Sequence, residues 1–153
     1  MVDYSKHIQK AQEATKRKNY DFAVELYQQI LEIEPDQGEA RSGLRLALKR
    51  RVEQKNGGGL LSKIGGAGPL VAAKAMAKAK RYDAAIKGLE KYLAGNPLDV
   101  KANLLLGECC ELAEHFHSAC AVYEFIAEIA PKNSEGLRLA GAMMYRTGEH
   151  TKA

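Results

Sequence analysis

The sequence predicts an all-α protein, an α-solenoid of antiparallel helix pairs with about four repeats, one of them degenerate. The main observation is a repeated motif of five residues in a fixed order: an aromatic residue, a small residue, two bulky residues and a proline. The motif occurs twice, and each residue lies 34 positions from its counterpart. The first copy is Tyr82, Ala85, Leu89, Tyr92 and Pro97, and the second is Phe116, Ala119, Tyr123, Ile126 and Pro131. A second observation is that Pro69 also lies 34 residues after Pro35. A fixed period near this length is typical of helix–turn–helix arrays.

The first predicted helix pair covers residues 4–35. Its first helix is expected to begin near Asp3 or Ser5, and its inner face consists of residues at helical spacing: Tyr4, Ile8, Ala11 and Thr15. The second helix follows Tyr20 and ends at Pro35, because proline cannot donate a backbone hydrogen bond and restrains the residue before it.

Residues 36–55 are predicted to form one long helix. Asp36 and Glu39 resemble a capping box at its start. Its apolar stripe is Leu44, Leu48 and Val52, and a parallel stripe of cations lies one position round the helix.

The pattern weakens in residues 56–69, which read NGGGLLSKIGGAGP and hold six of the fourteen glycines. Glycine costs about 1 kcal/mol relative to alanine inside a helix. We therefore expect a degenerate second helix or a hinge, with a free interdomain linker as the alternative. Exchange of halves between two copies at this segment would give an oligomer.

The chain accordingly divides into three parts. Residues 1–55 hold the first repeat and a basic helix, 56–69 the Gly-rich segment, and 70–153 an array that stops within its last helix pair. Pro97 follows Pro69 by only 28 residues, so the helix from Leu70 is expected to be short. Because the chain stops inside a pair, we expect a fragment of a longer protein or a partner that covers the end.

The repeating residues resemble those of the tetratricopeptide repeat (TPR) family. Leu106–Gly107, where glycine lets two helices approach closely, returns as Ala140–Gly141. The resemblance covers most of the chain and is closest in residues 81–153. Two departures are that Arg45 stands in the place of that glycine, and Asn103 in the place of the family's usual tryptophan. The resemblance implies a scaffold that binds a peptide or a partner helix on its concave face.

Composition and the N-terminus exclude other classes. The sequence has no run of eighteen apolar residues, and its first residues, MVDYSKHIQKAQ, lack an apolar segment, so neither a transmembrane helix nor a secretory signal is predicted. An odd number of cysteines, three, favours reduced thiols and a cytoplasmic protein.

Cysteines and histidines gather in one stretch, at Cys109, Cys110, His115, His117 and Cys120. Zinc needs four ligands that converge tetrahedrally, and this spacing matches no common zinc motif. Core cysteines with exposed histidines are the favoured interpretation. The Gly-rich segment lacks the order of a phosphate-binding loop, and no catalytic constellation is found, so we predict no enzyme, no metal and no cofactor.

The predicted binding surface is the concave face, formed by the first helix of each pair. Eight residues are expected to face a protein or peptide partner there: Lys74, Lys78, Lys101, Leu104, Glu108, Glu111, Arg138 and Tyr145.

A basic patch is the other candidate feature. The protein has a net charge of +4, and residues 41–80 hold ten Lys or Arg against one acidic residue, Glu53. The patch is predicted to comprise Arg41, Arg45, Lys49, Arg50 and Arg51. It suggests an alternative function, peripheral association with an anionic membrane. Nucleic-acid binding is not expected, because residues 41–80 contain no aromatic residue for base stacking.

Overall fold

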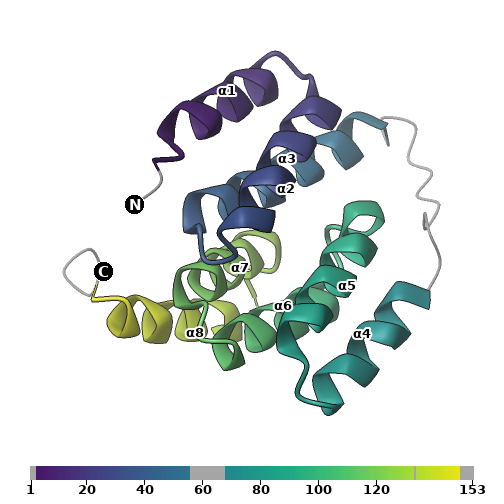
Figure 1. Ribbon diagram of the computed structural model, residues 1–153, viewed down its shortest axis with the longest axis vertical. Coiled ribbons are helices and arrows are strands. Elements are labelled where there is room, and N and C mark those ends of the chain that lie inside the picture. The colour runs from purple at the N-terminus through teal and green to yellow at the C-terminus, as the bar shows by residue number, and fades with distance from the viewer. Residues whose placement is uncertain (1–2, 56–67, 133, 149–153) are drawn as a thin grey trace.

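The computed structural model describes residues 3–55, 68–132 and 134–148, and all its regular structure there is helical. The helices succeed one another as antiparallel pairs around the chain (Figure 1). They are α1 (Ser5–Lys16), α2 (Tyr20–Ile33), α3 (Gly38–Lys55), α4 (Gly68–Lys78), α5 (Tyr82–Gly95), α6 (Val100–Leu112), α7 (Phe116–Ile129) and α8 (Ser134–Arg146). The predicted all-α solenoid of helix pairs is confirmed.

The turns inside the helix pairs repeat one backbone conformation. Lys18, Lys80 and Glu114 have φ values of 63°, 61° and 62°, and Gly148 has 78°. Residues 80, 114 and 148 are 34 positions apart, whereas 18 and 80 are 62 apart, which is one full period and one shortened by six residues. The left-handed residue is thus a fixed part of each turn, and it confirms the repeat register on both sides of the Gly-rich segment.

Helix α3 departs from this pattern, because it has no turn where the others turn. It continues past Val52, the position equivalent to Lys18, and reaches 18 residues, whereas α1 has 12 and α6 has 13. Most of the Gly-rich segment, residues 56–67, lies outside the described residues. The expectations of a degenerate helix or hinge there therefore stay predictions.

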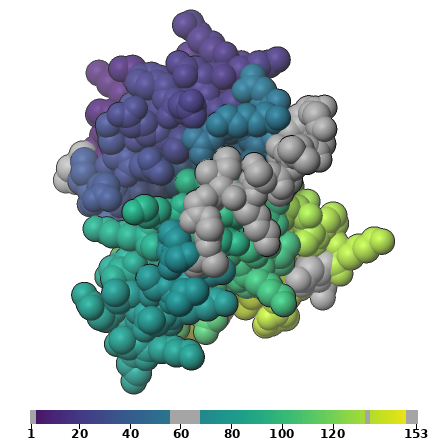
Figure 2. Space-filling model, turned by 90° about the vertical axis from the view of Figure 1, so that its right-hand side faces the viewer, coloured from purple at the N-terminus to yellow at the C-terminus, as the bar shows by residue number. Residues whose placement is uncertain are grey.

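Two hydrophobic cores hold the helices together. One joins α1, α2 and α3 around Tyr27, Leu44 and Leu48, and the other joins α4–α8 around Leu89, Leu106 and Tyr123. The first group, here called the N-terminal unit, lies to one side of α4–α8 in two perpendicular views (Figures 1 and 2). Ala94 of α5 packs against the core of the N-terminal unit, so the two groups touch there.

Helix α3 also joins the two groups, since it packs against α2 and also against α7. On the α2 side, a Cβ atom at Gly43 would meet the Tyr27 ring at 2.3 Å. On the α7 side, a Cβ atom at Gly38 would meet the His117 Cβ at 3.2 Å. Helix α3 is therefore fitted closely between an element next to it in sequence and one about 80 residues away.

Two helix starts differ from the sequence prediction. Helix α4 begins at Gly68, before Pro69 rather than after it, since proline is tolerated in the first turn of a helix. The start of α3 is capped by Gln37, whose Oε1 accepts from Glu39 N at 2.9 Å, and not by Asp36. Asp36 instead accepts a hydrogen bond from Ser118 N in the first turn of α7, so it caps a helix of the other group.

Candidate functional site

A groove of about 690 Å³ lies between α4 and α6, the first helices of two successive pairs. Its residues come mostly from these two helices, with Tyr82 from the start of α5. They are Leu70, Lys74, Ala77, Lys78, Tyr82, Asp99, Lys101, Ala102, Leu105, Glu108, Cys109 and Leu112. The volume falls within the range of about 300–1,000 Å³ that small-ligand pockets occupy.

Helical spacing explains why these side chains share one surface. On α4, Lys74 and Lys78 are one turn apart, with Leu70 one turn before them. On α6, Leu105 follows Lys101 by four residues, and Leu112 follows Glu108 by four residues. Residues four apart on a helix are neighbours on its surface, so each helix presents an apolar row edged by charged groups.

Three cations line this groove without an ion-pair partner among the described residues: Lys74, Lys78 and Lys101. Asp99 is engaged by its own surroundings, because its carboxylate accepts from Ala102 N at 3.1 Å and from the Tyr92 hydroxyl at 2.7 Å. The groove therefore offers three unpaired positive charges, and Glu108, on α6 with Lys101, is its exposed acidic group.

The structure brings four of the eight predicted binding residues into this groove: Lys74, Lys78, Lys101 and Glu108. The other four lie elsewhere. Leu104 packs against the core, and Glu111 accepts a hydrogen bond from the Tyr123 hydroxyl at 3.1 Å. Arg138 pairs with Glu135 at 2.6 Å, and Tyr145 is 74% exposed on α8.

Sequence reasoning missed the apolar floor, above all Leu105 and Leu112. It selected Leu104 instead, which lies one position round the helix. The signal was available in the spacing, because Leu105 follows the selected Lys101 by four residues and Leu112 follows the selected Glu108 by four.

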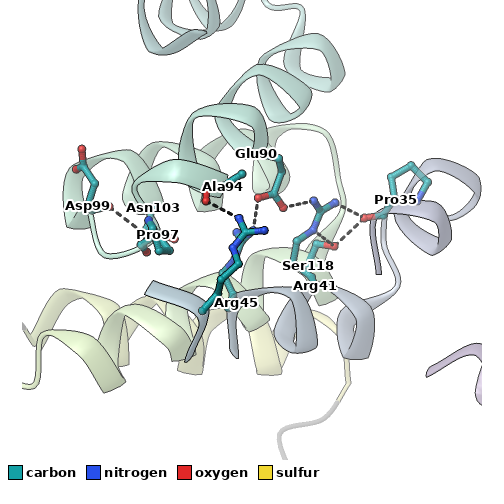
Figure 3. A network of polar contacts seen from close by, with 10 residues as sticks. Pro35, Arg41, Arg45, Glu90, Ala94, Pro97, Asp99, Asn103 and Ser118 are labelled. Carbon is teal, nitrogen blue, oxygen red and sulfur yellow. Dashed lines mark hydrogen bonds and ion pairs between the residues drawn. The ribbon is translucent and has the colours of Figure 1, made fainter. Parts of the chain in front are cut away.

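The predicted basic patch is corrected by the structure, because its five cations do not share one exposed surface. Arg41 and Arg45 are each only 2% exposed, and both donate to the carboxylate of Glu90 on α5 (Figure 3). Lys49 pairs with Glu128 at 3.1 Å, and Arg51 pairs with Asp21 at 2.9 Å and donates to Ala94 O. Arg50 is exposed. The feature that suggested membrane attachment is thus largely a set of contacts between α3 and its neighbours.

The buried cluster of Arg41, Arg45 and Glu90 joins the N-terminal unit to α5 and α7. Arg41 donates to Glu90 at 2.7 Å, to Ser118 Oγ at 3.2 Å and to Pro35 O at 2.8 Å. Burial alone would raise the pKa of Glu90, but the charges of Arg45 and Arg41 outweigh it, so this pKa lies below its ordinary value. Burial would lower the pKa of Arg41, yet attraction to Glu90 leaves it raised. Glu90 and Arg41 are therefore both charged at neutral pH.

This cluster also explains why an arginine stands at position 45. In α6 the equivalent residue is Gly107, where a Cβ atom would meet the Tyr123 ring of α7 at 2.3 Å. At the equivalent position of α3, the guanidinium of Arg45 reaches the carboxylate of Glu90 on α5. Asn103, in the place of the family's tryptophan, is fully buried and donates to Pro97 O and Asp99 O, which fixes the start of α6 (Figure 3).

The cysteines and histidines do not form a metal site or a nucleophile in the part of the chain that the structure describes. No group of three or more His, Cys, Asp or Glu side chains there could hold a metal ion. Burial raises the pKa of Cys109 to about 11 and that of Cys110 to about 12. Cys120 is buried and donates to Glu124 Oε1, and His115 pairs with Asp83 across 2.9 Å. The thiols of Cys109 and Cys110 are therefore protonated at neutral pH, which suits core residues.

Antiparallel helix pairs, a 34-residue period and a recurring contact between a glycine and a ring give this chain the fold of tetratricopeptide repeat proteins. Solved structures of MamA share the fold. One, from Desulfovibrio magneticus RS-1, is 19% identical and aligns over 99% of this chain and 90% of its own with a TM-score of 0.52. Another, MamA AMB-1, is 19% identical over 97% of this chain and 85% of its own, with a TM-score of 0.54. At this identity the likeness concerns the fold alone.

YrrB, described as a TPR protein with an unusual peptide-binding site, is 17% identical and aligns over 96% of this chain and 79% of its own. Its TM-score of 0.49 is too low to support an argument about this chain. No protein-family model and no curated protein sequence matches the chain. Within the described residues, no helix combines the length and the apolar character needed to cross a membrane.

Proposed function

We propose that this protein is a non-catalytic interaction scaffold that binds a peptide of a protein partner in the groove between α4 and α6. The observation that carries the proposal is the groove itself, because it joins an apolar floor to three cations that lack ion-pair partners among the described residues. Apolar burial supplies affinity, and polar groups at the edge fix orientation.

The two helices that form the groove are fixed by packing behind it. Ala73 of α4 is buried against Gly88 of α5, where a Cβ atom would come within 3.2 Å. Ala102, Leu106 and Cys109 of α6 belong to the same core. Because this packing forms the groove before a ligand binds, the protein loses less conformational entropy on binding.

The chemistry of the groove supports binding rather than catalysis. Its thiol, Cys109, is 1% exposed, and burial keeps its pKa near 11, so little thiolate is present at neutral pH. Free thiols at all three cysteines also suit a reducing compartment, and we place the protein in the cytoplasm on that ground.

Peptide selection followed by mapping tests the proposal. A random peptide library is selected against the whole chain, and the best peptide is titrated into ¹⁵N-labelled protein. We expect the amide shifts to change along α4 and α6. The variant Ala77→Phe, which places a ring in the groove, should abolish binding, whereas Ala75→Phe on the exposed side of α4 should not. Shift changes confined to other helices, or equal binding by both variants, would contradict the proposal.

A further inference from the structure

We infer that the α4–α6 groove binds an extended peptide in which acidic and apolar side chains alternate. This inference rests on the function proposed above and specifies the partner. The occupant follows from three properties of the groove: the sign of its unpaired charges, their spacing along α4, and the different character of its two walls.

The unpaired cations set the sign of the partner's charge. Elsewhere among the described residues, ion pairs are made by most arginines, as by Arg17 with Glu13 and Arg138 with Glu135, and among the lysines by Lys49 and Lys87. Lys74, Lys78 and Lys101 have no such partner, although all three are exposed and line one groove. Carboxylates of a bound peptide would supply the missing partners without first displacing an internal one.

The spacing of the lysines sets the conformation of the partner. Lys74 and Lys78 are one helical turn apart, so their Cβ atoms lie about 5–6 Å from each other. In an extended peptide, residues i and i+2 point to the same side and are about 6.6 Å apart. Acidic residues at alternate positions therefore match the two lysines one to one.

The second wall sets what lies between the acidic residues. In an extended peptide the intervening side chains point away from α4, towards α6. That wall carries Leu105 and Leu112, of which Leu112 is 52% exposed, while its one groove-lining cation, Lys101, lies one helical turn before Leu105 near the start of α6. Glu108 lies between these leucines and would repel a carboxylate pointing the same way. Apolar side chains are therefore favoured on this side and acidic ones on the other.

Fluorescence anisotropy with three labelled octapeptides tests the inference. The first alternates aspartate and leucine. The second alternates asparagine and leucine, which keeps shape and apolar area but removes charge. The third has the composition of the first with its aspartates four residues apart, which suits a helix. We expect the first to bind at least about tenfold more tightly than the other two, since two exposed ion pairs contribute about that much.

Charge variants assign the effect to the groove. The double variant Lys74→Gln/Lys78→Gln should weaken binding of the first peptide about tenfold and remove most of its salt dependence. The matched control Lys6→Gln/Lys10→Gln also removes two exposed lysines four apart on a helix, here α1, and should leave binding unchanged.

Three results would overturn the inference. Equal binding of the neutral peptide would show that charge is not recognised, and tighter binding of the third peptide would show a helical ligand. In both cases the proposed scaffold function stands if Ala77→Phe blocks binding. Absence of binding by all three peptides, when a library-selected peptide still maps to α4 and α6, refutes the alternating motif alone. If no selected peptide maps there either, the proposed function fails with it.

Discussion

Glu90 shows how much can depend on one side chain at the junction between the two cores. Its carboxylate is 13% exposed and accepts from both Arg41 and Arg45, which are almost fully buried. Removing it would leave two buried guanidinium groups without their counter-charge. Breaking a buried ion pair by deleting one partner is far more costly than losing an exposed one, because the remaining charge stays out of water.

We expect Glu90→Ala to lower the free energy of unfolding by about 3–5 kcal/mol, measured by urea denaturation. The matched control is Glu128→Ala, which removes an exposed carboxylate that also pairs with a cation of α3, Lys49. That exposed pair should contribute no more than about 1 kcal/mol. Similar losses in the two variants would show that the buried cluster has no special part in stability.

The same carboxylate predicts a pH dependence. The pKa of Glu90 is lowered in the folded protein, mainly because the charges of Arg45 and Arg41 outweigh the effect of burial. Its ionised form therefore stabilises the fold fully above the ordinary glutamate pKa of about 4.3, and this contribution is lost as the pH falls through the lowered value. The difference in unfolding free energy between wild type and Glu90→Gln should be large at neutral pH and shrink in acid. A difference that stays constant with pH would contradict this assignment.

Individual helices meet through glycines at matched positions, but their surroundings differ. A Cβ atom at Gly107 of α6 would meet the Tyr123 ring at 2.3 Å, and Tyr123 is only 2% exposed. At Gly141 of α8, one period later, a Cβ atom would have no described residue within 4 Å. The same residue is thus needed for packing in one helix and replaceable in the next.

Gly107→Ala should cost about 1–3 kcal/mol in unfolding free energy through overpacking. Gly141→Ala should stabilise by up to about 1 kcal/mol, because alanine restricts the unfolded chain and favours the helix. Thermal unfolding of the two variants provides the comparison. Melting temperatures that moved in the same direction would show that the two positions are equivalent in packing as well as in sequence.

Helix α7 obtains its N-terminal cap from the other group of helices. His115, before the first residue of α7, makes no side-chain cap, and Asp36 accepts from Ser118 N at 2.9 Å instead. Asp36→Ala should therefore cost about 0.5–2 kcal/mol, and Asp36→Asn should restore most of it. Hydrogen exchange should show faster exchange at the Ser118 amide in Asp36→Ala. An unchanged rate there would exclude this capping role.

At the scale of the whole molecule, two apolar cores meet through a polar junction. The junction contains the Glu90 cluster, the Asp36 cap, and Arg51 donating to Ala94 O near the end of α5. Such contacts depend on exact partners and not on the covalent connection between them. A second copy could therefore supply the same partners, which is how exchange of halves would give the predicted oligomer.

Light scattering at several protein concentrations checks this prediction. We expect a dimer at high concentration with the same helix content as the monomer, because exchange keeps every contact. Glu90→Ala weakens the same junction in the monomer and in the exchanged dimer, so it should leave the mass at a given concentration nearly unchanged. A strictly monomeric mass at every concentration would contradict exchange.

Much of the fold followed from local patterns in the sequence. The 34-residue recurrence predicted the helix pairs, but the short helix expected from the spacing between Pro69 and Pro97 is wrong, because α4 begins before Pro69 and keeps 11 residues. The sequence predicted four charged residues of the groove, because the register of a repeat determines which positions are exposed. They are Lys74, Lys78, Lys101 and Glu108. Leu105 and Leu112 were missed because the neighbours chosen for Lys101 and Glu108 lie three residues further on, at Leu104 and Glu111, and not four.

The sequence by itself determined the class of fold, the repeat register and the close contact at Gly107, because helix periodicity and close packing act between residues near in sequence. Only the tertiary structure decided what α3 contacts. Arg41 and Arg45 look like a basic surface in the sequence, but Glu90 and Ser118, far away along the chain, turn them into a buried junction. The physical reason is that the cost of burying a charge depends on whether a distant partner arrives, and no local pattern records that.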